Sequence, residues 1–392
     1  MTVLFYRYGS ICEPSIIQAF RSLNIDVVEE TAEMHNKNMT PQKCIDIMND
    51  AIKATRPVFV FSVNFFPAIA EICHLHKVFY LCWTVDSPVL ELFSNSIKHE
   101  TNCIFMFDRA QYDSFHPYNP NGIFHLPLAS DTTHYDTVIS TITDKDRKAY
   151  KNDICFVGSL YTEKNPMNSL SKPLPDYLSG YIDGIVESSL KIYGYNLVED
   201  VLTQDVVDTI QSSSESFFHL DDVVTDPSRY IAAHQYIGMQ IAEQERILTL
   251  NELAKHFPVT LYTRSDTTPL HNVQIHNGIQ TLTEMPKAFH LSKINLNMTI
   301  RPIQTGLPLR IFDILGCGGF LMTNYQPELE EHFEIGVDLE SYSSMEELID
   351  KCGYYLSHEE ERQQIASNGY QKVKQFHTYR NRLLDMLRII TT

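Results

Sequence analysis

The sequence contains no apolar run of the roughly 18 residues that a membrane-spanning helix requires, so we expect a chain without a transmembrane segment. Positive charge is also scarce: 31 lysines and arginines stand against 49 aspartates and glutamates, which gives a formal net charge of −18. Binding to the phosphates of DNA or RNA requires a basic surface, so we expect no nucleic-acid partner. Any phosphorylated small molecule must instead be held by local cations and helix N-termini.

Signals for secretion or for disulfide bonding are missing as well. The first residues, MTVLFYRYGSICEP, carry no basic start and no small-residue cleavage site, and we expect a first β-strand there. The eight cysteines are scattered and mostly lie inside apolar segments, which is typical of buried free thiols. We therefore expect a cytoplasmic protein.

The glycine fingerprint of nicotinamide-dinucleotide enzymes is absent. The first expected strand is followed by RYGSICEP at residues 7–14, which contains no G-x-G-x-x-G. The glycines of GCGG at residues 316–319 precede an apolar segment instead of following one, which is the wrong context for this fingerprint. A nicotinamide-dependent oxidoreductase is therefore disfavoured.

Short apolar segments alternate with helical patterns along most of the chain. Several of them, such as VFVFSVN at residues 58–64, lack polar alternation, which is typical of parallel strands covered on both faces. We predict an α/β protein with two doubly wound, Rossmann-like domains that face each other across a cleft. The predicted boundaries are a first domain at 1–145, a second at 146–375 and a last helix at 376–392, with a polar linker at 141–153 and a helical insertion at about 165–245.

Residues that directly follow predicted strands are the first candidates for a site, because ligands bind beyond the carboxyl ends of parallel strands. Gly158 and Ser159 follow one strand, where a glycine lets the backbone approach a ligand, and Lys164 could place a charge on a diphosphate. The alternative there is a tight turn with a solvated lysine. Asp86 follows another strand, and it could be a general base, contact a substrate hydroxyl or cap a helix beginning at Pro88.

Other clusters of polar residues carry weaker signals. The pair Asp108-Arg109 is interpreted as a turn, and Trp83 is expected in the core. The histidines of CHLH at residues 73–76 have no second cluster at the spacing of a metal site. The carboxylates of residues 144–146 lie in the polar linker and not at a strand end. We therefore expect no metal site.

The segment TGLPLRIFDILGCGGFLMTN, at residues 305–324, places two ionisable residues inside an apolar helical pattern. Thr305 or Gly306 is expected to cap this helix, and Pro308 suits its first turn. Glycines at its end then lead into a strand. The helix follows the strand pattern of INLNMTI, so its N-terminus should point beyond the carboxyl ends of the strands.

That helix N-terminus is a candidate anion site. Amides near Thr305, Gly306 and Leu307 would face the ligand, since the first N–H groups of a helix lack intrahelical partners. Arg310, with Arg301 upstream, would add bidentate donors for phosphate oxygens. Asp313, one turn further, could accept hydrogen bonds from two ribose hydroxyls. The alternative is that Arg310 and Asp313 merely form an i,i+3 ion pair.

These segments resemble the donor-binding domain of the GT-B glycosyltransferases, in which a turn rich in glycine and proline leads into such a helix and then a strand. SKINLNMTIRPIQTGLPLRIFDILGCGGFLMTNYQPELEEHF at residues 292–333 is most similar to the CgeB-like, spore-maturation-type branch, and the likeness extends over about residues 285–380. FVGSLYTEKN at 156–165 extends it to the start of the second domain. WTVDSPVLELF and FDRAQYDSFHPYNP resemble the N-terminal domain that often precedes it.

The resemblance implies roles for individual residues. Asp313 takes the place of the second glutamate of the family's E-x7-E motif and would hold the ribose, and Lys164 would bind the diphosphate. The first glutamate, which in related enzymes contacts the transferred sugar, falls at Thr305 and is absent. The resemblance implies no divalent metal and no cofactor beyond the nucleotide-sugar substrate. It also implies that the last helix returns to the first domain.

Two functions follow from the sequence. One is a glycosyltransferase that moves a sugar from a nucleotide-diphosphate sugar to a hydroxyl of a glycan, protein or small molecule, with the acceptor on the first domain. The other, motivated by the absent glutamate, is a catalytically degenerate GT-B protein that binds nucleotide or sugar, or that partners an active transferase.

Overall fold

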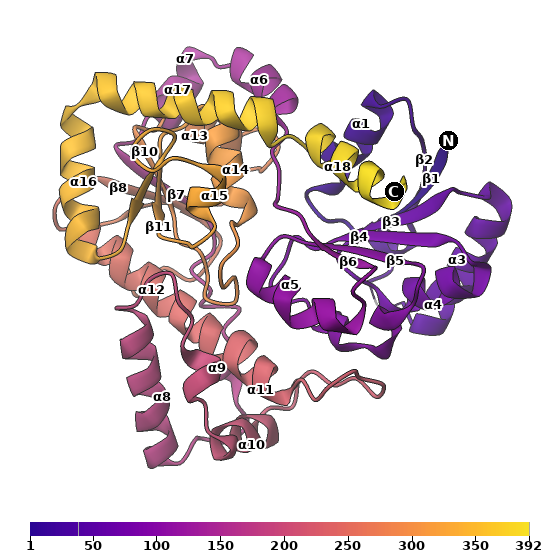
Figure 1. Cartoon of the computed structure of the whole chain (residues 1–392). Coiled ribbons are helices and arrows are strands. Elements are labelled where there is room, and N and C mark those ends of the chain that lie inside the picture. Colours follow the sequence, from indigo (N-terminus) through magenta and orange to yellow (C-terminus); the bar gives the residue numbers. More distant parts are fainter. Residues whose placement is uncertain (38, 392) are drawn as a thin grey trace. The chain divides into compact units, whose positions relative to one another are not determined.

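The computed structural model describes residues 1–37 and 39–391, which form two compact units, each built around its own sheet (Figure 1). The first unit combines Met1–Leu128 with the segment Phe218–Pro227 and the end of the chain from Thr378. The second unit comprises Ala129–Phe217 and Ser228–His377. Each sheet has six parallel strands, so the predicted pair of doubly wound α/β domains is confirmed.

The first sheet has the strand order β2-β1-β3-β4-β5-β6. Its central strands are almost entirely buried, as expected of apolar segments covered on both faces. The direction of winding reverses between β1 and β3, which marks the topological switch point of this sheet. The strands are β1 Thr2–Tyr6, β2 Asp26–Glu30, β3 Phe59–Val63, β4 Phe79–Trp83, β5 Asn102–Met106 and β6 Ile123–His125.

Helices surround the first sheet, and the last helix of the chain is among them. Helix α18 packs against α1, and the ring of Tyr379 meets that of Trp83 edge to face at 5.9 Å. The Arg382 Nε donates to the carbonyl oxygen of Pro127 at 2.8 Å. The helices of this unit are α1 Glu13–Ser22, α2 Ala32–His35, α3 Pro41–Thr55, α4 Pro67–His76, η1 Leu90–Phe93, η2 Asn95–Lys98, α5 Arg109–Phe115, η3 His116–Tyr118 and α18 Tyr379–Thr391.

The segment Phe218–Pro227 belongs to the first unit although it lies within the predicted helical insertion. It runs antiparallel to the residues between η1 and η2. The Val224 amide donates to the Phe93 carbonyl oxygen at 2.8 Å, and the Asn95 amide donates to that of Asp222 at 3.2 Å. Backbone hydrogen bonds therefore hold this segment in place.

The second sheet has the strand order β12-β11-β10-β7-β8-β9. Apolar side chains from both faces, including those of Ile154, Leu261 and Leu296, form its core. Winding reverses between β7 and β10, which makes these neighbours the switch point. The strands are β7 Ile154–Val157, β8 Val259–Thr263, β9 Gln274–Asn277, β10 Ile294–Asn297, β11 Leu321–Asn324 and β12 Glu340–Tyr342.

The second unit also contains most of the helical insertion, between β7 and β8. A π-helical stretch, η5, runs directly into α12 at the end of this insertion. None of the helices within the described residues is long and apolar enough to cross a membrane. The helices of this unit are α6 Thr132–Ser140, α7 Asp144–Tyr150, η4 Pro166–Ser169, α8 Asp176–Ser189, α9 Val198–Val201, α10 Gln204–Ser213, α11 Ser228–Tyr230, η5 Ile231–Ile237, α12 Gly238–Leu253, α13 Met285–Leu291, α14 Leu309–Gly316, α15 Leu329–His332, α16 Met345–Ser357 and α17 Glu359–Phe376.

The segment 141–153, interpreted from sequence as a linker, contains helix α7 and lies within the second unit. Thr143 and Asp146 form a capping box at the start of α7. The Lys287 ammonium lies 3.1 Å from a carboxylate oxygen of Asp146. The polar composition therefore reflects a solvent-facing helix attached to this unit.

Candidate functional site

The switch point of the second sheet is the natural place to look for a ligand site, since doubly wound sheets bind ligands beyond the carboxyl ends of the strands that flank it. The chain leaves β7 toward β8 and β9 on one side and later places β10, β11 and β12 on the other. Gly158 and Ser159 follow β7, and Met298 follows β10.

Arg246, which the sequence analysis missed, spans this switch point from helix α12. Its Nη1 donates to the carbonyl oxygen of Ser159 at 2.6 Å, and its Nη2 donates to that of Met298 at 2.8 Å. Burial lowers the pKa of the Arg246 guanidinium, and the two carbonyl acceptors offset part of the cost of burying its charge. The residue therefore fixes the two strand-end loops relative to each other and places a positive charge between them.

Lys164 and Arg310 bring further positive charge to the same region. The Lys164 ammonium and the Arg246 guanidinium lie 5.4 Å and 4.6 Å from the centroid of the same ring, that of Tyr161. Arg310 is close enough that its charge contributes to lowering the pKa of Arg246. Three cations therefore gather at the switch point, in a chain whose formal net charge is −18.

Hydrogen bonds from neighbouring loops order the turn after β7. The Gly158 amide donates to the Tyr262 carbonyl oxygen at 3.1 Å, and a Cβ at Gly158 would meet the Phe156 ring at 3.2 Å. The Ser159 hydroxyl donates to Glu163 at 2.8 Å. Both predicted residues thus lie at the switch point, and the ordered turn carries the exposed Lys164.

Helix α14 begins at Leu309 with Pro308 as its N-cap, and Pro308 provides no side-chain cap. The prediction that Thr305 or Gly306 caps this helix is therefore wrong. The Thr305 hydroxyl instead donates to the Glu328 carboxylate at 2.7 Å, and Gln326 Nε2 donates to the Gly306 carbonyl oxygen at 3.3 Å. The side chain of Leu307 is buried.

Arg310 and Asp313 lie close together, as their spacing predicts. The Arg310 Nη1 is 3.5 Å from Oδ2 of Asp313, and its guanidinium stacks over the Phe289 ring at 5.3 Å. The Tyr135 hydroxyl, from α6, donates to Oδ1 of Asp313 at 2.7 Å. Asp313 is only 5% exposed, and burial raises the pKa of its carboxyl group. Both carboxylate oxygens of Asp313 therefore have protein neighbours. Tyr135 could not be predicted as one of them because it lies far from Asp313 in the sequence.

Arg301 lies beside the helical insertion. Its Nη1 donates to the Ile192 carbonyl oxygen at 2.8 Å, and its Nη2 lies 3.2 Å from a carboxylate oxygen of Glu245. The residue lines a small hollow beyond the carboxyl ends of β10 and β11. Because the Glu245 carboxylate pairs with the charge of this buried guanidinium, these contacts favour a role in attaching the insertion.

In the first unit, Asp86 follows β4 and contacts Asn64, which follows β3 at the switch point of that sheet. Asn64, after β3, donates from Nδ2 to the Asp86 carboxylate at 2.7 Å and to the Tyr8 hydroxyl at 3.0 Å. The alternative that Asp86 caps a helix at Pro88 is wrong, because the next helix, η1, begins at Leu90 and has Val89 as its N-cap. The Asp86 side chain is exposed and available to a substrate.

The weaker sequence signals have structural explanations. Trp83 is fully buried, and its Nε1 donates to the Leu126 carbonyl oxygen at 3.3 Å. Asp108 caps helix α5 by accepting from the Ala110 amide at 3.1 Å. Among the described residues, no three histidine, cysteine or carboxylate side chains are grouped to hold a metal.

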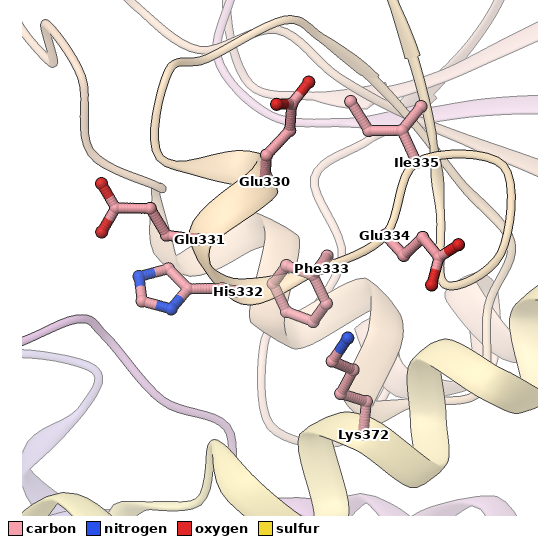
Figure 2. A pocket seen from close by; sticks show the side chains of 7 residues that line it. All are labelled: Glu330, Glu331, His332, Phe333, Glu334, Ile335 and Lys372. Carbon is pink, nitrogen blue, oxygen red and sulfur yellow. The ribbon is translucent and has the colours of Figure 1, made fainter.

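Figure 2 shows a separate hollow at α15 and the loop after it, with Lys372 of α17 opposite. Three of its seven lining residues are glutamates, and the Lys372 ammonium is paired with Asp338 at 2.6 Å. An acidic wall disfavours a diphosphate, so we place the candidate site at the switch point. The lining residues are Glu330, Glu331, His332, Phe333, Glu334, Ile335 and Lys372.

Comparison with known proteins gives a family match over part of the chain. Residues 244–388 match the family described as Glycosyl transferase-like. This region includes Arg246, helix α14 and five of the six strands of the second sheet. No curated protein sequence matches the chain.

Solved structures share the fold over the whole chain. Sucrose-phosphate synthase from Thermosynechococcus elongatus has a TM-score of 0.54 at 7% identity, with 100% of this chain and 98% of that one covered. Anabaena HepE in complex with UDP-glucose has a TM-score of 0.52 at 9% identity, with 100% and 99% covered. UDP-GlcNAc 2-epimerase from Neisseria meningitidis has a TM-score of 0.50 at 10% identity, with 100% of both covered. The fold is therefore GT-B, as in these structures.

Proposed function

We propose that this protein is a glycosyltransferase, of the CgeB-like branch, that moves a sugar from a nucleotide-diphosphate sugar to an acceptor hydroxyl. The observation that carries the proposal is the gathering of Lys164, Arg246 and Arg310 at the switch point of the second sheet, beside the N-terminus of α14. These cations suit a diphosphate, and they overcome the unfavourable net charge of the chain locally.

In the proposed reaction, the three cations act on the leaving group. The acceptor oxygen forms a bond to the anomeric carbon while the bond from that carbon to the phosphate oxygen breaks. The nucleoside diphosphate leaves with the electron pair, and the three cations stabilise its growing negative charge. The acceptor proton passes to a base, for which Asp86 is our candidate because it is exposed and held by Asn64.

The donor base and the need for a metal can be tested directly. Because HepE was crystallised with UDP-glucose, UDP is the first nucleotide to test, followed by GDP, dTDP and CDP. We propose a reaction without a divalent metal, so EDTA should leave the rate of transfer unchanged. The role of Asp313 in binding the ribose stays a prediction, since its carboxylate already contacts Tyr135 and Arg310.

Arg310→Ala tests the site assignment. Loss of a hydrogen bond to a charged group costs about 1.5–3 kcal/mol, so the affinity for the cognate nucleoside diphosphate should fall roughly 10- to 100-fold in calorimetry. Lys172→Ala is the matched control, because it removes an exposed positive charge from another part of the second unit. Equal affinities in the parent and Arg310→Ala would exclude this site.

The second candidate function is a non-catalytic GT-B protein that binds nucleotide or sugar, and the absence of a glutamate at Thr305 favours it. Most active transferases slowly release nucleotide from the donor to water, so a donor-hydrolysis assay across several nucleotide sugars separates the two. Binding without release of nucleotide, with or without candidate acceptors, would favour the non-catalytic protein.

A further inference from the structure

A small polar hollow lies beyond the carboxyl ends of β10 and β11, and the helical insertion forms part of its wall through Tyr195 and Asn196. Thr299, another of its lining residues, directly follows Met298, whose carbonyl oxygen accepts from Arg246 at the switch point. The hollow has a volume of about 10 Å³, which is roughly the space that one water-sized group requires. It therefore fits a single polar group beside the candidate site.

Arg301 brings to this hollow a buried hydrogen-bond donor that lacks a partner. The side chain is only 7% exposed, and its two terminal nitrogens contact Ile192 and Glu245. Its Nε has no hydrogen-bond partner among the residues that the structure describes. Nearly all buried polar groups in proteins are paired, and an unpaired one is costly. The Arg301 Nε thus points to a ligand atom that accepts a hydrogen bond at this place.

Gln326 offers the complementary group. Its Nε2 donates to the carbonyl oxygens of Ile303 and Gly306 at 3.2 Å and 3.3 Å, which leaves its amide oxygen as an acceptor. The Glu245 carboxylate already balances the charge of Arg301 at 3.2 Å, so the ligand group need not be an anion. A hydroxyl group both accepts and donates hydrogen bonds, and it matches a hollow that offers one donor and one acceptor.

We propose that this hollow binds a single hydroxyl group of a sugar, which accepts from Arg301 Nε and donates to the amide oxygen of Gln326. The inference rests on the proposed function, because the hollow adjoins the switch point that would hold the diphosphate. The hydroxyl belongs to the transferred sugar or to a sugar acceptor, which share this chemistry. The insertion takes part in the selection, since Asn196 Nδ2 donates to the Arg301 carbonyl oxygen at 2.9 Å.

Sugars that each lack one hydroxyl group test this proposal in the parent protein. In one arm, calorimetry compares UDP-glucose with derivatives that each lack one hydroxyl of the glucose ring. In the other arm, methyl glucoside and its corresponding derivatives bind in the presence of UDP. Both arms are repeated with GDP, dTDP and CDP. Removal of one particular hydroxyl should weaken binding about 10- to 100-fold, as expected for losing a hydrogen bond to a charged group. The arm in which this loss occurs identifies the sugar.

Variants then connect that hydroxyl to the hollow. Arg301→Lys retains a positive charge for Glu245 and loses the Nε donor, so removal of the same hydroxyl should change its affinity less than about twofold, and its affinity for UDP should match that of the parent. Arg147→Lys, an exposed arginine of the second unit, is the matched control and should behave as the parent. Thermal unfolding shows whether each variant is folded. Ile303→Phe, which adds bulk to the lining, provides the same comparison if Arg301→Lys does not fold.

The outcomes distinguish this inference from the proposed function. If the parent binds a nucleoside diphosphate but no single hydroxyl matters more to the parent than to the folded variants, the hollow holds at most a water molecule, and the inference alone is wrong. An equal loss of affinity for UDP and for every glucose derivative in folded Arg301→Lys also overturns it, because Arg301 then only attaches the insertion. If the parent binds no nucleoside diphosphate and no derivative, both proposals fail together.

Discussion

Arg246 offers the sharpest test of how the second unit builds its site. Its guanidinium donates to two carbonyl oxygens, one after β7 and one after β10, at 2.6 Å and 2.8 Å. Each hydrogen bond from a charged donor contributes about 1.5–3 kcal/mol. Arg246→Lys retains the charge but loses the planar fork that reaches both carbonyls, so the free energy of unfolding should fall by roughly 2 kcal/mol, the value of one such bond.

The charge and the positioning can be separated by a second variant and a control. Arg246→Gln removes the charge, and the affinity for the cognate nucleoside diphosphate should fall about 10- to 100-fold. Arg264→Lys, which changes an exposed arginine after β8 at the same edge of the sheet, should stay within about 0.5 kcal/mol of the parent.

Urea unfolding gives the stabilities, and calorimetry gives the affinities. If Arg246→Lys unfolds at the same urea concentration as the parent and Arg246→Gln binds nucleotide equally well, then Arg246 neither fixes the two loops nor serves the ligand.

Two remaining predictions concern buried titratable groups. Burial raises the pKa of the Asp313 carboxyl group in the folded protein, so ionisation of this group destabilises the fold. This destabilisation is absent below the pKa of the unfolded state and grows as the pH rises through the pKa of the folded state. Asp313→Asn keeps an acceptor for Tyr135, and its stability relative to the parent should therefore increase from about pH 4 to about pH 7; a difference independent of pH in urea unfolding would contradict this. All eight cysteines are buried and form no disulfide, and burial raises the pKa of Cys103 to about 11 and of Cys155 to about 12. A thiol reagent at about pH 8 should therefore label the native protein slowly and all the cysteines after denaturation; rapid labelling before denaturation would refute it.

The two parallel sheets could be predicted because their signal is local. A parallel strand covered on both faces must be apolar throughout, as β3 is at Phe59–Val63. The i,i+3 spacing of Arg310 and Asp313 likewise predicted their proximity. Patterns within a few residues were sufficient for these features.

Contacts between distant parts of the chain could not be predicted in the same way. The helical insertion separates Arg246 from Ser159 in the sequence, and no local pattern distinguishes Arg246 from the other polar residues of α12. The partners of Asp313 and Thr305, namely Tyr135 and Glu328, are equally remote in sequence. Each of these contacts depends on which strand ends the sheet topology brings together.

The wrong predictions came from side chains that have other partners in the fold. Thr305 does not cap α14, because its hydroxyl donates to Glu328. Asp86 does not cap a helix, and its carboxylate accepts from Asn64 instead. The segment 141–153 is polar because it contains α7, a helix none of whose residues is buried. Polarity and capping propensity are local preferences that tertiary contacts override.

The proposed function requires cations at the switch point of the second sheet to bind the diphosphate of a sugar donor for transfer. Its most direct test is the release of nucleoside diphosphate from UDP-, GDP-, dTDP- and CDP-sugars by the parent and by a double variant, Arg246→Gln with Arg310→Ala. We predict that the parent releases nucleotide from one class of donor and that the folded double variant does not. Release at equal rates by both proteins, or release from no donor, would contradict the proposed glycosyl transfer at this site.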